Sequence, residues 1–301
     1  MLQSPLTPST RYRSSDGTER VLFTLADGKS VESVFLPEKA RDTICISSQV
    51  GCAVDCHFCL TAKMGLERNL TAQEIAGQAA FFVHEKNIDV KTRPVNVVLM
   101  GQGEPLLNLD AVLEAHKIMT NQRGLSLAPR RISLSTSGIL PKMIELGQHA
   151  QRPRLAVSLN ASHQEQRERL MPITRKYRLD ELIRVCRDFP VKRAERILFE
   201  YVLLDGVNDS DADAHRVVEL LKGIPAVVNL LPWNAAPGLD FAKPPPARVH
   251  AFHEIVARAM PCYERKTRGE DISAACGQLK LVSLTGTPPA HSPQSIPALL
   301  P

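Results

Sequence analysis

Short apolar segments alternate with amphipathic segments along most of the chain. Continuous apolar runs predict strands that are buried on both faces, at residues 95–100, 132–135, 155–159, 197–204 and 227–231. Apolar residues recur at helical spacing around these runs, at residues 71–86, 109–119, 141–146, 164–170, 179–188, 211–222 and 246–260. Such alternation predicts parallel strands joined by right-handed crossovers, in a barrel, a partial barrel or an open sheet.

The beginning of the chain has a pattern typical of antiparallel strands. Two short apolar runs, 21–25 and 31–35, flank Asp27-Gly28, a dipeptide that favours a tight hairpin turn. Residues 44–47 can extend this sheet, whereas residues 1–20 are polar and predict a flexible N-terminus. We therefore expect a β-hairpin extension at 21–44, one main domain at 45–281 and a Pro-rich, disordered tail at 282–301.

Composition narrows the possible partners and locations. The 301 residues carry a formal net charge of +5, which permits a nucleic-acid partner without requiring one. Aromatic residues make up 5% of the chain, which argues against binding of single strands mainly by stacking. No apolar run approaches the roughly 18 residues of a membrane span, and residues 1–15 lack the apolar core of a signal peptide. We expect a cytoplasmic protein that does not bind a membrane.

The cysteines include one cluster that requires a chemical explanation. Three of the seven, Cys52, Cys56 and Cys59, form the pattern C-x3-C-x2-C. Three thiolates in one loop can ligate a metal or a cluster and leave one coordination position open. Two interpretations follow: a zinc site with His57 or Cys45 as the fourth ligand, or a [4Fe–4S] cluster with one iron open to another ligand.

The spacing of this triplet resembles that of the radical S-adenosylmethionine (SAM) superfamily, and six further segments narrow the resemblance. They are CISSQVGC at 45–52, GQGEPL at 101–106, SLSTSG at 133–138, AVSLNA at 156–161, PWN at 232–234 and RKTRGEDISAACGQL at 265–279. In this order they resemble the RlmN/Cfr family of radical-SAM RNA methyltransferases, from about Arg11 to Leu281. The resemblance implies a partial (β/α)6 TIM-like barrel with a small N-terminal β-extension.

The resemblance also implies an activity, methylation of an adenine carbon in RNA. For most members this is C2 of an adenosine in 23S ribosomal RNA and in tRNA, and for others it is C8. Because an aromatic C2 is not nucleophilic, the family uses a second thiol, here Cys276, which receives a methyl group from one SAM. A second SAM supplies a radical that activates this methyl group. Glu32 would then accept a proton, and Cys45 would resolve the protein–RNA adduct through a transient disulfide with Cys276.

The family's cofactor ligands map onto loops and strand ends of this chain. The [4Fe–4S] cluster would be held by Cys52, Cys56 and Cys59. The positions that match the SAM contacts are Gly103, Glu104, Ser135, Ser158, Leu159, Asn160 and Asn234. Two positions depart from the family pattern: Gln102 stands where Met is usual, and Asn160 where better-known members have His. Basic residues that could contact RNA phosphates are Arg265, Lys266, Arg268, Arg169, Arg175, Lys176 and Arg178.

The implied partners are 23S ribosomal RNA, tRNA and an electron-donating reductant such as flavodoxin, and we expect a monomer. Family members usually carry a small helical N-terminal domain, and this chain begins about where that domain would end. Two other hypotheses remain open at this point. One is a radical-SAM enzyme that acts on a peptide or small molecule and does not need Cys276. The other is a non-enzymatic, zinc-binding RNA module.

Overall fold

The computed structural model describes residues 6–236, 238–274, 277–279 and 294–295. The strands are β1 Leu6–Arg13, β2 Glu19–Leu25, β3 Ser30–Pro37, β4 Asp42–Ile46, β5 Gln49–Gly51, β6 Leu66–Asn69, β7 Val95–Leu99, β8 Ile132–Thr136, β9 Arg154–Ser158, β10 Ile197–Leu203, β11 Ala226–Pro232, β12 Cys262–Glu264 and β13 Gln294–Ser295. The helices are α1 Ala72–Glu85, α2 Leu109–Thr120, α3 Leu140–Gln148, α4 Gln164–Leu170, α5 Leu179–Asp188, α6 Asp211–Leu221 and α7 Pro246–Ala257.

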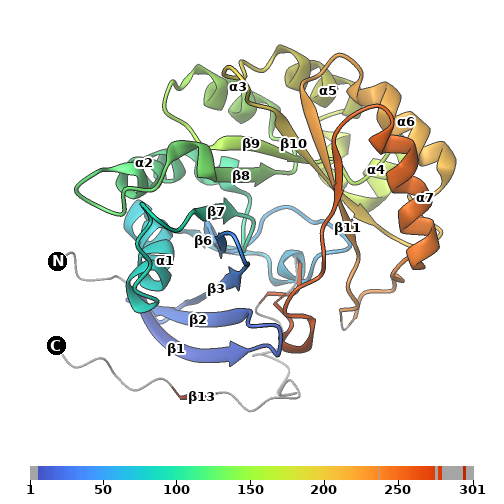
Figure 1. The fold of residues 1–301 in the computed structure, drawn as a ribbon. Helices are drawn as coiled ribbons and strands as arrows, with labels where there is room; N and C mark the ends of the chain where they lie inside the picture. Colours follow the sequence, from blue (N-terminus) through green and yellow to red (C-terminus); the bar gives the residue numbers. More distant parts are fainter. Residues whose placement is uncertain (1–5, 237, 275–276, 280–293, 296–301) are drawn as a thin grey trace.

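One long curved sheet organises the chain, in the order β12-β11-β10-β9-β8-β7-β4-β3-β2-β1-β13. From β4 to β12 all neighbours are parallel, as expected of strands joined by helical crossovers. Figure 1 shows these strands as a crescent with the helices on its outer side. The expected partial (β/α)6 barrel is confirmed. In parallel barrels, the loops at the carboxyl ends of the strands form the active site.

The crescent is held by apolar side chains between sheet and helices. Val97, Leu134 and Val157 on successive strands are almost completely buried, because parallel strands are covered on both faces. Helix α1 begins with the capping box that its sequence indicates, in which the Thr71 hydroxyl accepts from Glu74 N and the Glu74 carboxylate accepts from Thr71 N. The start of helix α1 therefore follows from local sequence.

The antiparallel extension is larger than the hairpin we expected. Strands β2 and β3 pair around Asp27-Gly28, as predicted. The expectation of a flexible segment at 1–20 is wrong for residues 6–13, which form β1 against β2. Buried ion pairs compensate for its polar sequence, since Arg11 contacts both Glu19 and Glu85. The tail expected at 282–301 lies outside the described residues except for residues 294–295, which form β13 beside β1.

The segment after β12 returns to the antiparallel extension (Figure 1, red). Arg268 donates to the carboxylate of Asp16 in the turn between β1 and β2, and Gly269 N donates to the same carboxylate at 3.1 Å. Ile272 and Ala274 then pack against Val34 of β3. The two ends of the described fold are thus joined at one side of the crescent. No described helix has the length and apolar character to cross a membrane.

Candidate functional site

The cysteine triplet lies in the loop between β5 and a short 3-10 helix at Leu60–Met64. This loop follows the carboxyl end of β4, the first parallel strand. The loop is fixed from several directions: Cys59 N donates to Cys56 O at 3.1 Å, His57 N to Leu170 O at 3.0 Å, and Trp233 Nε1 to Phe58 O at 3.3 Å. The end of helix α4 and the loop after β11 therefore hold the triplet in place.

The three thiols are half-buried, and the charge of one affects the pKa of another. Burial raises the pKa of the Cys52 thiol to about 12, and the charges of Glu104 and Cys59 add to the effect. Burial and then the charges of Cys59 and Cys52 raise the pKa of Cys56. Burial also raises the pKa of Cys59. Three such sulfurs become thiolates together only when a positively charged group binds them, which is the chemistry of an iron–sulfur cluster.

The same donors could serve a zinc ion only if a fourth ligand joined them. His57 is 3.6 Å from Asp55, and its side chain is 43% exposed. Within the described residues no group of three or more His, Cys, Asp or Glu side chains is arranged to hold a metal ion as it stands. Ligands of a four-iron cluster bind separate iron atoms, so they need not converge on one point. The triplet fits such a cluster in donor type, and the ligand set stays a prediction.

Gly103 and Glu104 lie in the loop that follows β7. Gly103 has φ +103°, and a Cβ there would stand 2.6 Å from the Cβ of Gln49, so only glycine allows this close approach. The buried carboxylate of Glu104 accepts from the backbone N and the hydroxyl of Ser137, both at 2.7 Å. Burial raises its pKa, and these hydrogen bonds oppose the rise. Its charge also reaches Cys52, so the predicted SAM loop adjoins the cysteine loop.

The other predicted SAM contacts lie at neighbouring strand ends. The hydroxyls of Ser135 on β8 and Ser158 on β9 are 3.2 Å apart, so the structure brings this pair together. Leu159 is fully buried and offers only its backbone. The side chain of Asn160 is hydrogen-bonded within the protein, since its Oδ1 accepts from Val202 N at 2.9 Å. Asn234, after β11, accepts from the hydroxyl of Thr267 at 3.0 Å. Their contacts with SAM stay predictions.

Glu32 and Cys45 lie on adjacent antiparallel strands. Glu32 on β3 is fully buried, and Arg20 Nη1, also fully buried, donates to its Oε1 at 3.2 Å. Cys45 on β4 is paired with Val34, two residues beyond Glu32. The hydroxyl of Ser47 donates to the carbonyl of Glu32 at 2.7 Å, which ties the end of β4 to this residue. The two residues predicted to act on the RNA adduct are thus neighbours in the sheet.

Cys276 and the residue before it lie outside the described residues, whereas Ala274 and residues 277–279 are placed. Leu60 N donates to Gly277 O at 2.7 Å, directly beside the cysteine triplet. Gln278 Nε2 donates to Ala235 O at 2.7 Å in the loop after β11. Ala274 and Leu279 pack in one apolar cluster against which Cys45 is also packed. Described residues that flank 275–276 are therefore placed both beside the cysteine loop and in the cluster that Cys45 contacts.

Sequence reasoning missed Arg167, which the structure places under this site. It is 1% exposed, and its guanidinium donates to the carbonyls of Ser137, Ser158 and Leu159 and to the hydroxyl of Thr174. Burial lowers the pKa of Arg167 to about 10, and the charge of Cys56 opposes this shift. Arg167 stands three residues before Leu170 on α4, so the two side chains share one face of the helix. This spacing was the one sequence feature that could have indicated that Arg167 is buried.

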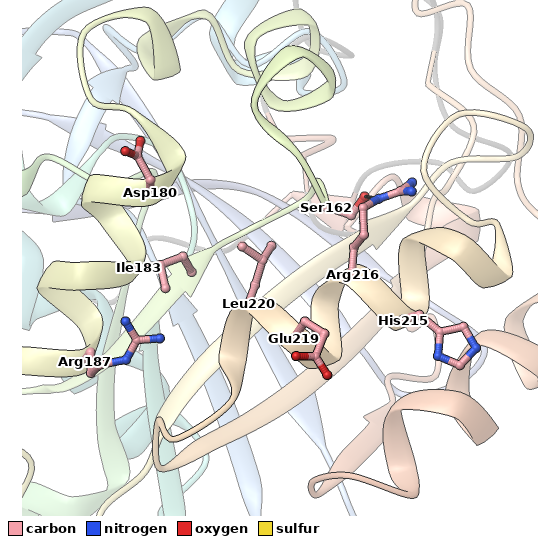
Figure 2. A pocket seen from close by; sticks show the side chains of 8 residues that line it. All are labelled: Ser162, Asp180, Ile183, Arg187, His215, Arg216, Glu219 and Leu220. Atoms are coloured by element: carbon pink, nitrogen blue, oxygen red, sulfur yellow. Dashed lines mark hydrogen bonds between the residues drawn. The ribbon is translucent and has the colours of Figure 1, made fainter.

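Several basic residues considered for RNA binding have contacts within the protein. Arg268 is occupied by Asp16, and its hydrogen bond contributes to a pKa of Asp16 well below the usual range. Arg178 contacts Asp180 at 3.2 Å on the surface. A groove between α5 and α6, lined by side chains that include Arg187 and Arg216, lies on the outer helical layer (Figure 2). None of the predicted site residues lines it.

Comparisons with known proteins agree with this arrangement. The Radical SAM superfamily model matches residues 46–217. The chain is 48% identical over 303 residues to the dual-specificity RNA methyltransferase RlmN of Anaeromyxobacter dehalogenans, covering 94% of this chain and 80% of that one. It is 48% identical to the RlmN of Geobacter sulfurreducens, covering 92% and 75%. A crystal structure of a radical SAM methyltransferase from Sphaerobacter thermophilus superposes with a TM-score of 0.87 at 42% identity, covering 91% of this chain and 81% of that one. The chain therefore belongs to the RlmN family within the radical SAM superfamily.

Proposed function

We propose that this protein methylates C2 of an adenosine in 23S ribosomal RNA and in tRNA, using two SAM per turnover. The observation that carries the proposal is the position of the segment around Cys276. Its neighbour Gly277 accepts a hydrogen bond from the residue that follows Cys59, and Ala274 and Leu279 pack in the cluster that contacts Cys45. The described residues before and after 275–276 thus contact the cysteine loop and the apolar cluster against which Cys45 packs.

The cofactors would be held at the strand ends described above. Cys52, Cys56 and Cys59 would ligate a [4Fe–4S] cluster, and the loops after β7, β8, β9 and β11 would contact SAM. When bound, the cluster supplies the electron that cleaves SAM to a 5′-deoxyadenosyl radical. The protein's part is to exclude water and to hold the reacting groups in line, which the buried Glu104 and Arg167 support by fixing these loops.

The sulfur and carboxylate groups of the chain would carry out the remaining steps. The Cys276 thiolate takes a methyl group from SAM by displacement and, after loss of a hydrogen atom from that methyl group, forms a carbon–carbon bond to the adenine. The adduct would then lose its unpaired electron to the oxidised cluster and its C2 proton to Glu32. The Cys45 thiolate attacks the Cys276 sulfur and forms a disulfide with it. The carbon–sulfur bond breaks, its electron pair stays with the methylene carbon, and this carbon takes up a proton to become the methyl group. A reducing compartment and an electron donor such as flavodoxin would reset the enzyme, which favours the cytoplasm.

Nucleoside mass spectrometry tests the proposal directly. Anaerobically reconstituted protein would be incubated with SAM, a reductant and unmodified ribosomal RNA, beside the Cys276→Ala variant. The matched control is Cys262→Ala, since Cys262 is a buried thiol on β12 outside the site. We expect 2-methyladenosine from the native protein and from Cys262→Ala, and none from Cys276→Ala.

Other products would change specific parts of the proposal. Formation of 8-methyladenosine would keep the role of Cys276 and overturn the assignment to C2. Cleavage of SAM without any methylated RNA would overturn the substrate. Activity of Cys276→Ala would point instead to a radical-SAM enzyme on another class of substrate. A colourless protein that holds zinc and no iron would support the non-enzymatic alternative, whereas about four irons per chain would exclude it.

A further inference from the structure

Gln102 carries an amide that the described protein leaves without a partner. The side chain is 1% exposed, and neither Oε1 nor Nε2 has a hydrogen-bond partner among the residues that the structure describes. A buried amide left in this state costs free energy, so native proteins rarely keep one without a use. Methionine, which the family usually has here, would fill the same space without that cost.

A buried glutamine nearby shows the contrast. Gln78 on α1 is fully buried, and its Oε1 accepts from the Ser33 hydroxyl at 2.6 Å and from Ser47 N at 2.8 Å. Its Nε2 donates to the carbonyls of Ser47 and Glu74. This amide is saturated by the protein itself. Gln102 is equally buried and has none of these bonds, so its free donor and acceptor point to a ligand.

The position of Gln102 indicates which ligand. Its backbone N donates to the Ser47 hydroxyl at 2.9 Å, and this same hydroxyl donates to the carbonyl of Glu32. The Gln102 carbonyl accepts from Ser48 N at 2.9 Å and from Gln49 N at 3.2 Å, and Gln49 begins β5, the strand that leads into the cysteine loop. The Gln102 backbone therefore contacts the chain just after β4, beside the residue proposed to take a proton from the adduct, and the strand that precedes the loop proposed to hold the cluster. Under the proposed function, the adenine has to come within reach of Glu32.

We propose that the Gln102 amide binds the target adenine along its N6/N7 edge, with Oε1 accepting from the N6 amine and Nε2 donating to N7. This inference rests on the proposed function. Glutamine offers an adjacent donor and acceptor, and adenine offers the complementary pair at N6 and N7. Enzymes that act on a base extrude it from its stack and read it by hydrogen bonds to one of its edges.

The choice of edge bears on which carbon is methylated. C8 is bonded to N7, so an amide seated at N6/N7 crowds C8. C2 lies at the opposite side of the purine, between N1 and N3, and stays open. Hydrogen bonding of the amide to N6 and N7 therefore favours methylation at C2 and disfavours methylation at C8. Gln102 would be a specificity-determining residue of this chain.

The test combines one change in the protein with one change in the base. Native protein and Gln102→Met would be assayed on matched RNAs that carry adenosine or 7-deazaadenosine at the target position. The 7-deaza base keeps the N6 amine and replaces N7 by a carbon that cannot accept a hydrogen bond. The control is Gln78→Met, which removes a saturated buried amide outside the proposed contact. Iron content and SAM cleavage without RNA would be measured for all three proteins.

We expect the native protein to lose roughly tenfold or more in kcat/KM on the 7-deaza RNA, the effect of leaving a buried donor unpaired. Gln102→Met should be weaker on adenosine RNA and should treat the two RNAs alike. Gln78→Met should discriminate as the native protein does. Equal discrimination by native protein and Gln102→Met would overturn the inference. So would a loss in Gln102→Met confined to SAM affinity. A native protein that methylates no adenosine would instead refute the proposed function, and the inference with it.

Thermal unfolding without RNA gives a readout that does not depend on activity. Replacing an unpartnered buried amide by an apolar side chain of similar volume removes a desolvation cost, so Gln102→Met should raise the melting temperature. Gln78→Met leaves the Ser33 hydroxyl and the backbone of Ser47 unsatisfied and should lower it. A lower melting temperature for Gln102→Met would show that the protein already satisfies this amide, and would overturn the inference.

Discussion

Arg167 offers a sharp test of how the strand ends are held together. Its guanidinium is buried and, in the described part of the chain, forms no ion pair with a carboxylate; its partners are three carbonyls and one hydroxyl. Arg167→Met keeps the volume of the stem and removes every donor. Three buried carbonyls then lose a hydrogen-bond donor, and each loss destabilises the fold by about 1–3 kcal/mol. The variant no longer buries a charged guanidinium, which offsets part of this destabilisation. We expect a net loss of about 3 kcal/mol in the free energy of unfolding.

The same variant should change the chemistry of Cys56. The positive charge of Arg167 lowers the pKa of the Cys56 thiol, against the larger effect of burial. Without that charge the pKa rises further, the thiolate fraction falls, and alkylation of Cys56 in the metal-free protein becomes slower at alkaline pH. The assays are urea unfolding and iodoacetamide labelling of Cys56 read by peptide mass spectrometry. Iron bound after reconstitution should fall in parallel.

A second buried arginine provides the control. Arg152 is 3% exposed, contacts Glu195 at 2.9 Å and donates to Pro190 O at 2.6 Å, just before β9 begins. Arg152→Met should therefore lose stability of a similar size without changing the alkylation of Cys56. Our reasoning is refuted if Arg167→Met stays within about 1 kcal/mol of the native protein. It is equally refuted if both variants slow the alkylation alike.

Three further predictions follow from buried groups and one strained turn. Burial lowers the pKa of His116 to about 4 from an ordinary value near 6.5, so its contribution to stability is present above pH 6.5 and is lost as the pH falls toward 4. His116→Leu should therefore remove about 2 kcal/mol of acid destabilisation at pH 5, measured by urea unfolding at pH 7 and pH 5; an unchanged pH slope would contradict this. Arg20→Met should destabilise by roughly 3 kcal/mol because it leaves Glu32 charged and buried, and the double variant with Glu32→Leu should regain much of the loss in the same assay. Gly103→Ala should lower the melting temperature more than Gly206→Ala, because both glycines have positive φ but only Gly103 has a side chain 2.6 Å from the added Cβ.

The sequence predicts the parallel part of the fold well because each of its elements has a strong local pattern. The apolar run at 95–100 became β7 at Val95–Leu99, and the helical spacing at 179–188 became α5 with the same bounds. Strand β1 was missed because its sequence is polar and its one buried polar residue, Arg11, pairs with a partner distant in sequence, Glu85. No local pattern distinguishes such a residue from one that faces solvent.

The residues of the candidate site also differ in whether the sequence predicts them. The cysteine triplet and the loop at 101–106 could be found because their residues are close in sequence and chemically unusual. Arg167 could not, because a charged residue on a helix is most often exposed. The pairing of Arg20 with Glu32 depends on the register of the hairpin, in which Val34 opposes Arg20 and Glu32 opposes Leu22. Only the folded sheet shows that these two side chains meet.

The hydrogen bond between Leu60 N and Gly277 O also sets an order of events during synthesis. The cysteine loop leaves the ribosome more than 200 residues before Gly277 does. At translation rates of about 5–20 residues per second, this interval is roughly 10–40 s. During that time the cysteine loop exists without its hydrogen bond to Gly277. A nascent chain thus has a defined period in which iron and sulfide can reach the loop before this contact forms.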